Sequence, residues 1–233
     1  RRRGRGLDLP GQPGRATGRP GPGVPVRLED GVAAQLGLLG DEDLRSPDRG
    51  ELVETPAWFV EALCPVLWPW GRRILDPGAG LGAIGRALHL WCARTKRTAS
   101  SAPEVTAVEL YADRCEELQA SGHYAEVVCS GILEWCATSP GRWPLVLLNP
   151  AFRQWPAWVE ALHGVLEPGG RIFALVPWEH ISRRESFWRH RPAHAVHRTS
   201  RRPWKRETRE CCWVEWRAGG SLETRLHWLD VRK

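Results

Sequence analysis

Short apolar strands alternate with longer helical segments between residues 73 and 176, and this alternation limits the fold more than any other feature. Strands are expected at 73–76, 105–110, 125–129, 145–148 and 171–176, and helices at 83–96, 111–121 and 155–166. Strands that are apolar along their whole length must be covered on both faces, as in parallel sheets. The sequence therefore predicts an α/β protein with a doubly wound, mainly parallel sheet.

Residues 1–48 differ in composition from the rest of the chain. Glycine and proline occupy 12 of the first 25 positions, and such a segment buries too little apolar surface to order itself. We expect a disordered or loosely attached arm at 1–48, either a linker or a contact for nucleic-acid phosphates, and a folded domain at 49–233. That domain should open with a helix that has Thr55 as its N-cap and Pro56 at its first position.

The regular alternation of strands and helices stops after the strand at 171–176. A short helix is expected at 182–190, followed by a basic stretch and two further strands at 211–216 and 226–230. Gly219-Gly220 lies between these last two strands and predicts a hairpin loop. The sheet should therefore carry a basic C-terminal extension.

The composition argues against several classes of protein. The seven cysteines include no Cys-x-x-Cys pair, so we expect no zinc or other metal site, and mostly buried thiols in a reducing compartment. No apolar run approaches the roughly 18–20 residues of a membrane span. Pro10 and Pro13 interrupt the region where a signal peptide would need its apolar core. We therefore expect a cytoplasmic protein that has no membrane partner.

The positive charge is concentrated in one segment. The formal net charge is +6, and residues 181–209 alone hold ten basic and two acidic side chains. Arginine binds phosphate oxygens through paired hydrogen bonds, and an indole can stack on an unpaired base. We predict that 181–216 contacts nucleic acid, the alternative being a solvated arginine-rich surface. The candidate contacts are Arg183, Arg184, Arg198, Arg201, Arg202, Trp204, Lys205 and Arg206.

A glycine-rich turn follows the first strand of the alternation. The strand ends in Asp76, and Gly78, Gly80 and Gly82 precede the next helix. Glycine permits a tight turn and lets a ligand lie against the backbone, and helix N-terminal amides face the same crevice. The second strand ends in Glu109, a position from which an acid can bind ribose hydroxyls. This order of turn and acid predicts a nucleotide-type cofactor site.

A second turn, Asn149-Pro150-Ala151-Phe152, follows the strand at 145–148. Ligands of open α/β folds bind at the carboxyl ends of the strands. The Asn149 side-chain oxygen and the Pro150 carbonyl can each accept a hydrogen bond, and an exocyclic amine offers two N–H donors. Phe152 provides a face on which a planar base can stack. The turn therefore predicts a site for an amine on a planar base.

Both turns resemble motifs of one family. The run from Asp76 to Gly82 resembles the first motif of the class I S-adenosylmethionine-dependent methyltransferases, which have a Rossmann-like fold. The second turn resembles the (Asn/Asp)-Pro-Pro-(Tyr/Phe) motif of amino-methyltransferases, especially those acting on N6 of adenine in DNA. The resemblance covers about residues 54–216. It implies that the contacts to S-adenosyl-L-methionine are Asp76, Gly78, Ala79, Gly80 and Glu109, and that the base is held by Asn149, Pro150 and Phe152.

Two residues depart from the family's pattern. Ala151 stands where the family has a second proline, which loosens the turn but leaves Asn149 and the Pro150 carbonyl in place. Gly131 stands where the family commonly has an aspartate that holds the adenine amino group of the cofactor, and Ser130 is the candidate substitute. Loss of one such contact weakens binding by about 1–2 kcal/mol.

The resemblance implies methyl transfer to an exocyclic amine, N6 of adenine in DNA before RNA. Two alternatives stay open. One is a methyltransferase that acts on RNA adenine or on a protein glutamine, whose amide offers similar donors. The other is a non-catalytic nucleic-acid-binding module of the same fold, which Gly131 and Ala151 favour. Cofactor binding distinguishes this last alternative from both enzymes.

Overall fold

The computed structural model describes residues 53–67, 73–95, 102–139, 141–151, 153–183, 185–200, 210–220 and 223–230. The expected arm at 1–48 lies outside these ranges. The strands are β1 (Arg73–Pro77), β2 (Glu104–Glu109), β3 (Glu126–Cys129), β4 (Trp143–Leu148), β5 (Leu166–Pro177), β6 (Ala195–Thr199), β7 (Cys211–Arg217) and β8 (Arg225–Leu229). The helices are α2 (Ala57–Leu67), α3 (Ala83–Arg94), α4 (Ala112–Ser121), α5 (Ile132–Thr138), α6 (Trp155–His163), α7 (Trp178–Arg183) and α8 (Glu185–His190).

The strands form one sheet in the order β3-β2-β1-β4-β5-β7-β6-β8. The pairs from β3 to β5 are all parallel, and β7 pairs antiparallel with both β5 and β6. The chain runs outward from β1 through β2 to β3 and then returns to the other side of β1 as β4. The predicted α/β fold with a mainly parallel sheet is confirmed, and the point where the strand order reverses lies between β1 and β4.

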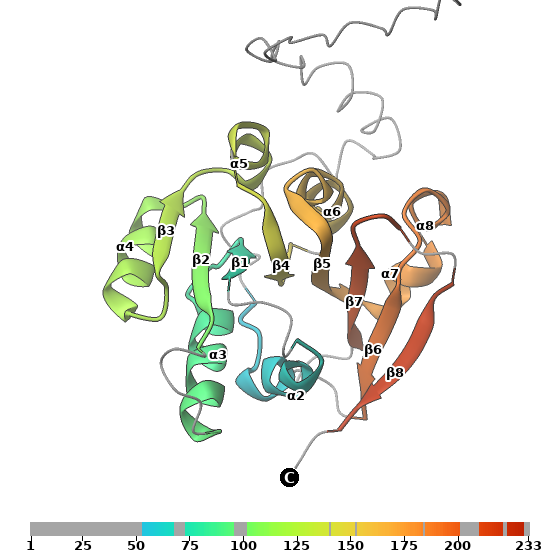
Figure 1. Ribbon diagram of the computed structural model, residues 1–233, viewed down its shortest axis with the longest axis horizontal. Coiled ribbons are helices and arrows are strands. Elements are labelled where there is room, and N and C mark those ends of the chain that lie inside the picture. Colours follow the sequence, from blue (N-terminus) through green and yellow to red (C-terminus); the bar gives the residue numbers. More distant parts are fainter. Residues whose placement is uncertain are drawn as a thin grey trace, which may run out of the picture.

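Both faces of the sheet are covered, as the apolar strands predict. Figure 1 shows α2 and α3 on one side of the sheet and α5 and α6 on the other. Neighbouring residues of β1 point to opposite faces: Ile74 packs with α2 and α3, whereas Leu75 packs with α6. Val146 packs with Leu75, and Leu145 packs with Ile74. Each fully buried leucine of this kind stabilises the fold by ~1.5–3 kcal/mol.

Several helices differ from their predicted bounds. The single helix expected at 182–190 is two helices, α7 and α8, and α7 begins at Trp178. Helix α2 begins at Ala57, because the Pro56 carbonyl accepts hydrogen bonds from the amides of Phe59 and Val60 at 2.9 and 3.4 Å. Pro56 therefore precedes the helix instead of being its first residue. Helix α6 ends at His163, three residues early, because the chain from Leu166 onward already belongs to β5.

The predicted hairpin between 211–216 and 226–230 is wrong. Strand β6 lies between β7 and β8, and it pairs antiparallel with β7 and parallel with β8. Gly219 and Gly220 do adopt positive φ angles of 94° and 79°, but their turn does not join paired strands. Strand β6 was not predicted because His197 and Arg198 interrupt its apolar character within the arginine-rich segment.

Strand β6 keeps His197 buried through an ion-pair network centred on Glu215 of β7. Glu215 Oε2 lies 2.9 Å from His197 Nε2, and Glu215 Oε1 accepts hydrogen bonds from Arg171 Nε and Arg217 Nε at 2.9 and 2.7 Å. Burial alone would raise the pKa of Glu215, but the hydrogen bonds from His197, Arg171 and Arg217 outweigh it and hold the pKa well below its usual range. The network connects β5, β6 and β7.

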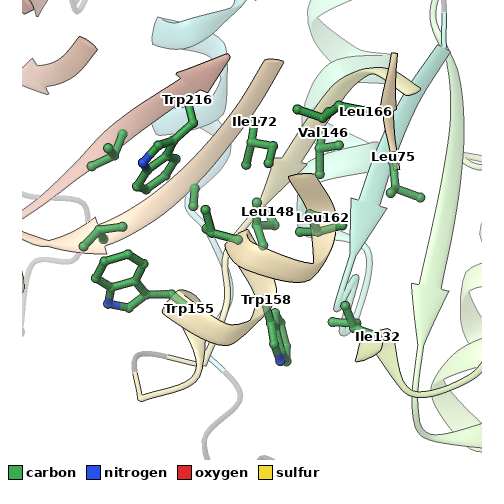
Figure 2. Packing of buried hydrophobic residues seen from close by; sticks show 14 of the residues in the cluster. Leu75, Ile132, Val146, Leu148, Trp155, Trp158, Leu162, Leu166, Ile172 and Trp216 are labelled. Carbon is green, nitrogen blue, oxygen red and sulfur yellow. The ribbon is translucent and has the colours of Figure 1, made fainter. Parts of the chain in front are cut away.

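An aromatic cluster joins helices α6 and α8 to strand β7. The rings of Trp188 and Trp216 stack with centroids 5.7 Å apart and an interplanar angle of 6°. Trp155 lies 6.0 Å from Trp216, and Phe187 meets Trp155 edge-on at 4.8 Å. Figure 2 shows Trp155 of α6 facing Trp216 of β7. Trp188 therefore packs within the fold, although it belongs to the segment expected to contact nucleic acid.

Candidate cofactor and acceptor site

The glycine turn folds onto the end of β2. Gly78, Gly80 and Gly82 have φ angles of 75°, 58° and 79°, a region that disfavours residues with a Cβ atom. The amides of Gly78 and Ala79 donate to the Val108 carbonyl at 2.7 and 3.3 Å. The turn therefore lies against the carboxyl ends of β1 and β2, as predicted, and α3 begins directly after it.

Glu109 contacts the glycine turn directly. Its Oε2 accepts a hydrogen bond from the Gly80 amide at 2.8 Å, and its Oε1 accepts one from the Tyr111 amide at 3.1 Å. Arg114 lies 3.8 Å from the same Oε1. An ionised carboxylate has about four lone-pair sites, so the two backbone bonds leave acceptor capacity for ribose hydroxyls. The geometry of Glu109 fits the role expected for the acid at the end of β2.

Asp76 is fully buried, and it is held by a tyrosine that the sequence analysis did not single out. The Tyr124 hydroxyl donates to Asp76 Oδ2 at 2.8 Å and accepts a hydrogen bond from the Gly85 amide at 3.1 Å. Asp76 Oδ1 is buried without a hydrogen-bond partner among the described residues. Gly85, a glycine inside a helix, was the one available signal of a close approach at this point.

Burial raises the pKa of the Asp76 carboxyl to about 7. The hydrogen bond from Tyr124 opposes this shift, and the nearby carboxylate of Glu109 adds to it. A buried carboxyl oxygen without a partner, beside a glycine turn, is a suitable acceptor for a cationic ligand group. S-adenosyl-L-methionine carries such a group in its amino nitrogen. Asp76 and Glu109 together therefore fit the cofactor that the sequence implies.

Gly78 has a packing role that the sequence did not reveal. A Cβ atom at this position would lie 2.8 Å from Cζ3 of Trp158 and 3.4 Å from Cδ1 of Ile132. Figure 2 places Trp158 of α6 and Ile132 of α5 on the same side of β1. The turn is therefore closely covered on the α6 side, and a side chain at Gly78 would collide with an indole ring.

The end of β3 supplies no carboxylate to the site. Ser130 follows Cys129, and its amide donates to the Glu109 carbonyl at 2.9 Å. The Ser130 hydroxyl donates to the Gly131 carbonyl at 3.2 Å. Gly131 then precedes α5, a helix that was not predicted. The structure places Ser130 beside Glu109, and its role as a substitute for the missing aspartate stays a prediction.

Asn149 and Pro150 lie at the end of β4, directly beside β1. Leu75 pairs with Val146 in the parallel ladder, so the second turn and the glycine turn share one edge of the sheet. The half-buried Asn149 donates from Nδ2 to the Val53 carbonyl at 2.8 Å. This bond orients the amide and leaves Oδ1 as an acceptor. Pro150 is buried.

Several predicted site residues lie outside the described ranges. They are Phe152, Arg184, Arg201, Arg202, Trp204, Lys205 and Arg206. Of the other predicted phosphate contacts, Arg183 is exposed at the end of α7. Arg198 Nη2 donates to Glu210 Oε2 at 2.8 Å, so its charge is already paired. In the predicted segment 181–216, residues 211–216 form a buried strand that offers no surface to a polymer.

Metal and membrane features can be checked for the same ranges. No three His, Cys, Asp or Glu side chains in the described residues gather in a way that could hold a metal ion. None of the described helices has the length and apolar character to cross a bilayer. All seven cysteines are free thiols, and five of them are buried.

Comparison with known proteins identifies the fold but no sequence family. No protein-family model matches the sequence, and the search of curated proteins finds no match. A Listeria monocytogenes structure described as a class I S-adenosylmethionine-dependent methyltransferase aligns with a TM-score of 0.61 at 12% identity, over 86% of this chain and 72% of the other. A predicted O-methyltransferase from Agrobacterium tumefaciens aligns with a TM-score of 0.53 at 18% identity, over 74% and 84%. The chain therefore has the fold of class I methyltransferases.

Proposed function

We propose that this chain is an S-adenosyl-L-methionine-dependent methyltransferase acting on an exocyclic amine of a nucleic-acid base, N6 of adenine in DNA before any other. One observation carries the proposal: the glycine turn, which contacts Glu109 at the end of β2, and the Asn149-Pro150 turn follow the adjacent parallel strands β1 and β4. The fold of the two structural neighbours supports the cofactor. The acceptor is inferred from the second turn and from the positive charge of 181–209.

The chemistry asked of the chain is mainly positioning. S-adenosyl-L-methionine, when bound, supplies a methyl group on a positively charged sulfur and so needs no further activation. Asn149 Oδ1 and the Pro150 carbonyl accept the two N–H groups of the amine, which turns its lone pair away from these acceptors. The same oxygens stabilise the positive charge that develops on the nitrogen. Phe152 stacks on the base, and the basic residues of 181–209 bind phosphates.

The cofactor site is tested by Gly80→Val, with calorimetric titration of S-adenosyl-L-methionine as the measurement. A β-branched residue is disfavoured at the φ of 58° in Gly80, and its side chain would occupy the turn, so binding should be lost. Gly122→Val is the matched control, because Gly122 has a φ of 68° and caps α4, and a Cβ atom at this position would have no neighbour within 4 Å. The control should lose stability but keep its affinity. Folded wild type that binds no cofactor would exclude the enzyme.

The acceptor is tested by incubating the protein with methyl-labelled cofactor and separate pools of DNA, RNA and protein. Label in N6-methyladenine of DNA is the expected result. Label in RNA or in glutamine would keep the enzyme and change its substrate. A protein that binds oligonucleotides but neither binds the cofactor nor transfers label would be a non-catalytic module of this fold.

A further inference from the structure

An exposed row of aromatic and basic side chains lies at the carboxyl ends of β5, β6 and β8, on the side of the sheet away from β3. Trp178 begins α7 directly after β5, Arg198 lies on β6, and Trp228 lies on β8. The guanidinium carbon of Arg198 is 4.2 Å from the ring centre of Trp178 and 5.4 Å from that of Trp228. Arg198 is fixed by Glu210, whose carbonyl also accepts the Trp178 amide at 2.7 Å. These contacts hold two indoles and a cation in one surface.

Three large apolar side chains of this surface are exposed to solvent. Trp228 is 64% exposed and Trp178 is 37% exposed. Leu226, two residues before Trp228 on the same face of β8, is 55% exposed. Large apolar side chains that adjoin one another at a surface mark an interaction site. Arg198, whose charge is paired with Glu210, orients the two indoles through its contacts with both rings.

The position of the surface relates it to the proposed acceptor site. β6 and β8 run parallel to each other and, through β7, in the same direction as β5 and β4. Their carboxyl ends therefore share the edge that carries Asn149. Four strand spacings separate β4 from β8, about 19 Å, and about six stacked nucleotides cover that distance at 3.4 Å each.

The charge around the surface favours nucleic acid as its partner. Ser200 and Glu210 border residues 201–209, which contain five basic residues and one acidic residue. The exposed Arg183 ends α7, the helix that Trp178 begins. Indole rings bind unpaired bases by stacking, which tolerates any base sequence. The guanidinium of Arg198 contacts both rings and so holds Trp178 and Trp228 close to each other.

We propose that Trp178 and Trp228 form a stacking surface for unpaired bases of the nucleic-acid strand, a few nucleotides from the base held at Asn149. This inference rests on the nucleic-acid acceptor proposed above. It names the partner at this surface as single-stranded or locally opened nucleic acid. A second protein copy that adds to the edge strand β8 is the competing occupant.

The test compares two fluorescein-labelled 12-mers, oligothymidine and an abasic strand with the same number of phosphates, by anisotropy. Thymine offers no adenine amine, so the Asn149 site contributes little. Wild type should bind oligothymidine roughly 5- to 100-fold more tightly than the abasic strand. Trp228→Ala and Trp178→Ala should each remove most of that preference and leave abasic binding unchanged. Leu90→Ala, an exposed apolar change on α3 away from this surface, should alter neither affinity more than about twofold.

Each of the following results would overturn the inference. The first is wild type with no preference for the base-bearing strand, and the second is tryptophan variants that lose affinity for both strands equally. The third is a wild-type dimer in light scattering that Trp228→Ala dissociates, since the surface would then belong to a second copy. If the acceptor experiment labels DNA but both tryptophan variants keep the wild-type preference for oligothymidine, the stacking surface is refuted and the proposed enzyme is not. If the methyl label appears only in protein but the tryptophan variants lose the preference for oligothymidine, the proposed acceptor is refuted and the stacking surface is not.

Discussion

Asp76, Tyr124 and Gly85 form a hydrogen-bonded chain beneath the glycine turn. This chain explains two glycines at once, because a Cβ at Gly82 would lie 3.2 Å from Cε2 of Tyr124 and a Cβ at Gly85 would collide with Cζ of the same ring. Tyr124 therefore ties β1 to the start of α3. At the scale of single residues, the protonation of Asp76 is the property with the clearest consequence.

Cofactor affinity should depend on pH through Asp76. Its pKa of about 7 means that the carboxyl is largely protonated below neutrality, and only the ionised form attracts the cationic amino group of the cofactor. Affinity should rise by about tenfold between pH 6 and pH 7.5 and then level off. Calorimetry across this range checks the rise. Asp76→Asn should bind weakly at every pH, whereas Glu117→Gln, an exposed carboxylate on α4, should keep the wild-type curve.

The Asp76 carboxyl has the opposite pH effect on the cofactor-free protein: rising pH lowers its stability. The folded pKa lies above the unfolded value of 3.8, so the folded state retains the proton longer. Stability from this group is therefore complete below pH 3.8 and is lost as the pH rises toward about 7. Asp76→Asn should remove this loss in urea unfolding at pH 7.

Two substitutions at Asn149 distinguish its proposed role as an acceptor through Oδ1 from its hydrogen bond to the Val53 carbonyl. Asn149→Ala removes both the Oδ1 acceptor and the Nδ2 bond to the Val53 carbonyl. It should slow single-turnover methylation by about two orders of magnitude, which corresponds to roughly 3 kcal/mol in the transition state. Asn149→Asp retains an acceptor, although it sets a carboxylate oxygen against the Val53 carbonyl and adds a negative charge, so it should keep more activity than Asn149→Ala. Equal activity in wild type and Asn149→Ala would make the turn purely structural.

At the scale of secondary structure, the parallel half of the sheet was predictable and the rest was less so. Strands β1, β2 and β4 are apolar runs between turn residues, and local pattern was enough to find them. Strand β6 was missed because its buried His197 is stabilised by Glu215, a partner 18 residues away that no local pattern shows. The same long-range pairing excluded the hairpin. Helix α5 was missed because seven residues give too little periodicity.

Glu215 should be essential for the assembly of β5, β6 and β7. Glu215→Gln leaves Arg171 buried without its counter-charge, which typically costs about 3–5 kcal/mol. Urea unfolding at pH 7 measures this loss. The folded pKa of Glu215 is depressed, so its contribution is present above the ordinary value of 4.5 and is lost as the pH falls below it. Glu61→Gln, which removes the partner of the exposed Arg94, should cost far less, because solvent screens exposed ion pairs.

At the scale of the whole molecule, the described candidate site residues lie at the edge formed by the carboxyl ends of the parallel strands. Residues at the opposite edge serve as controls for them. The glycine turn, Asn149 and Trp178 lie where the parallel strands end. The sequence predicted the first two through their motifs. It could not predict Trp178 or Trp228, because their proximity depends on the order of β5, β7, β6 and β8.

DNA affinity should fall with salt, and Arg201 and Arg202 should contribute to the slope. Replacement of both by Ala should reduce the slope of log affinity against log salt by about 2, because each phosphate contact contributes about 0.9. Anisotropy titrations at several salt concentrations provide the slopes. Arg94→Ala with Arg142→Ala removes the same charge at the amino end of the sheet and should leave the slope nearly unchanged. A slope unaltered in the first variant would place the phosphate contact elsewhere.

The stacked pair of Trp188 and Trp216 gives the protein an optical signature. Two indoles 5.7 Å apart and nearly parallel have coupled electronic transitions, which should appear as a strong paired band in ultraviolet circular dichroism. One ring belongs to α8 and the other to β7, so the band exists only while that helix is docked on the sheet. Trp188→Phe should weaken the band to what the pair of Trp155 and Trp216 contributes, and Trp91→Phe, on α3, should leave it unchanged. Thermal melts followed at this band would report when α8 leaves the sheet, independently of the loss of helical signal elsewhere.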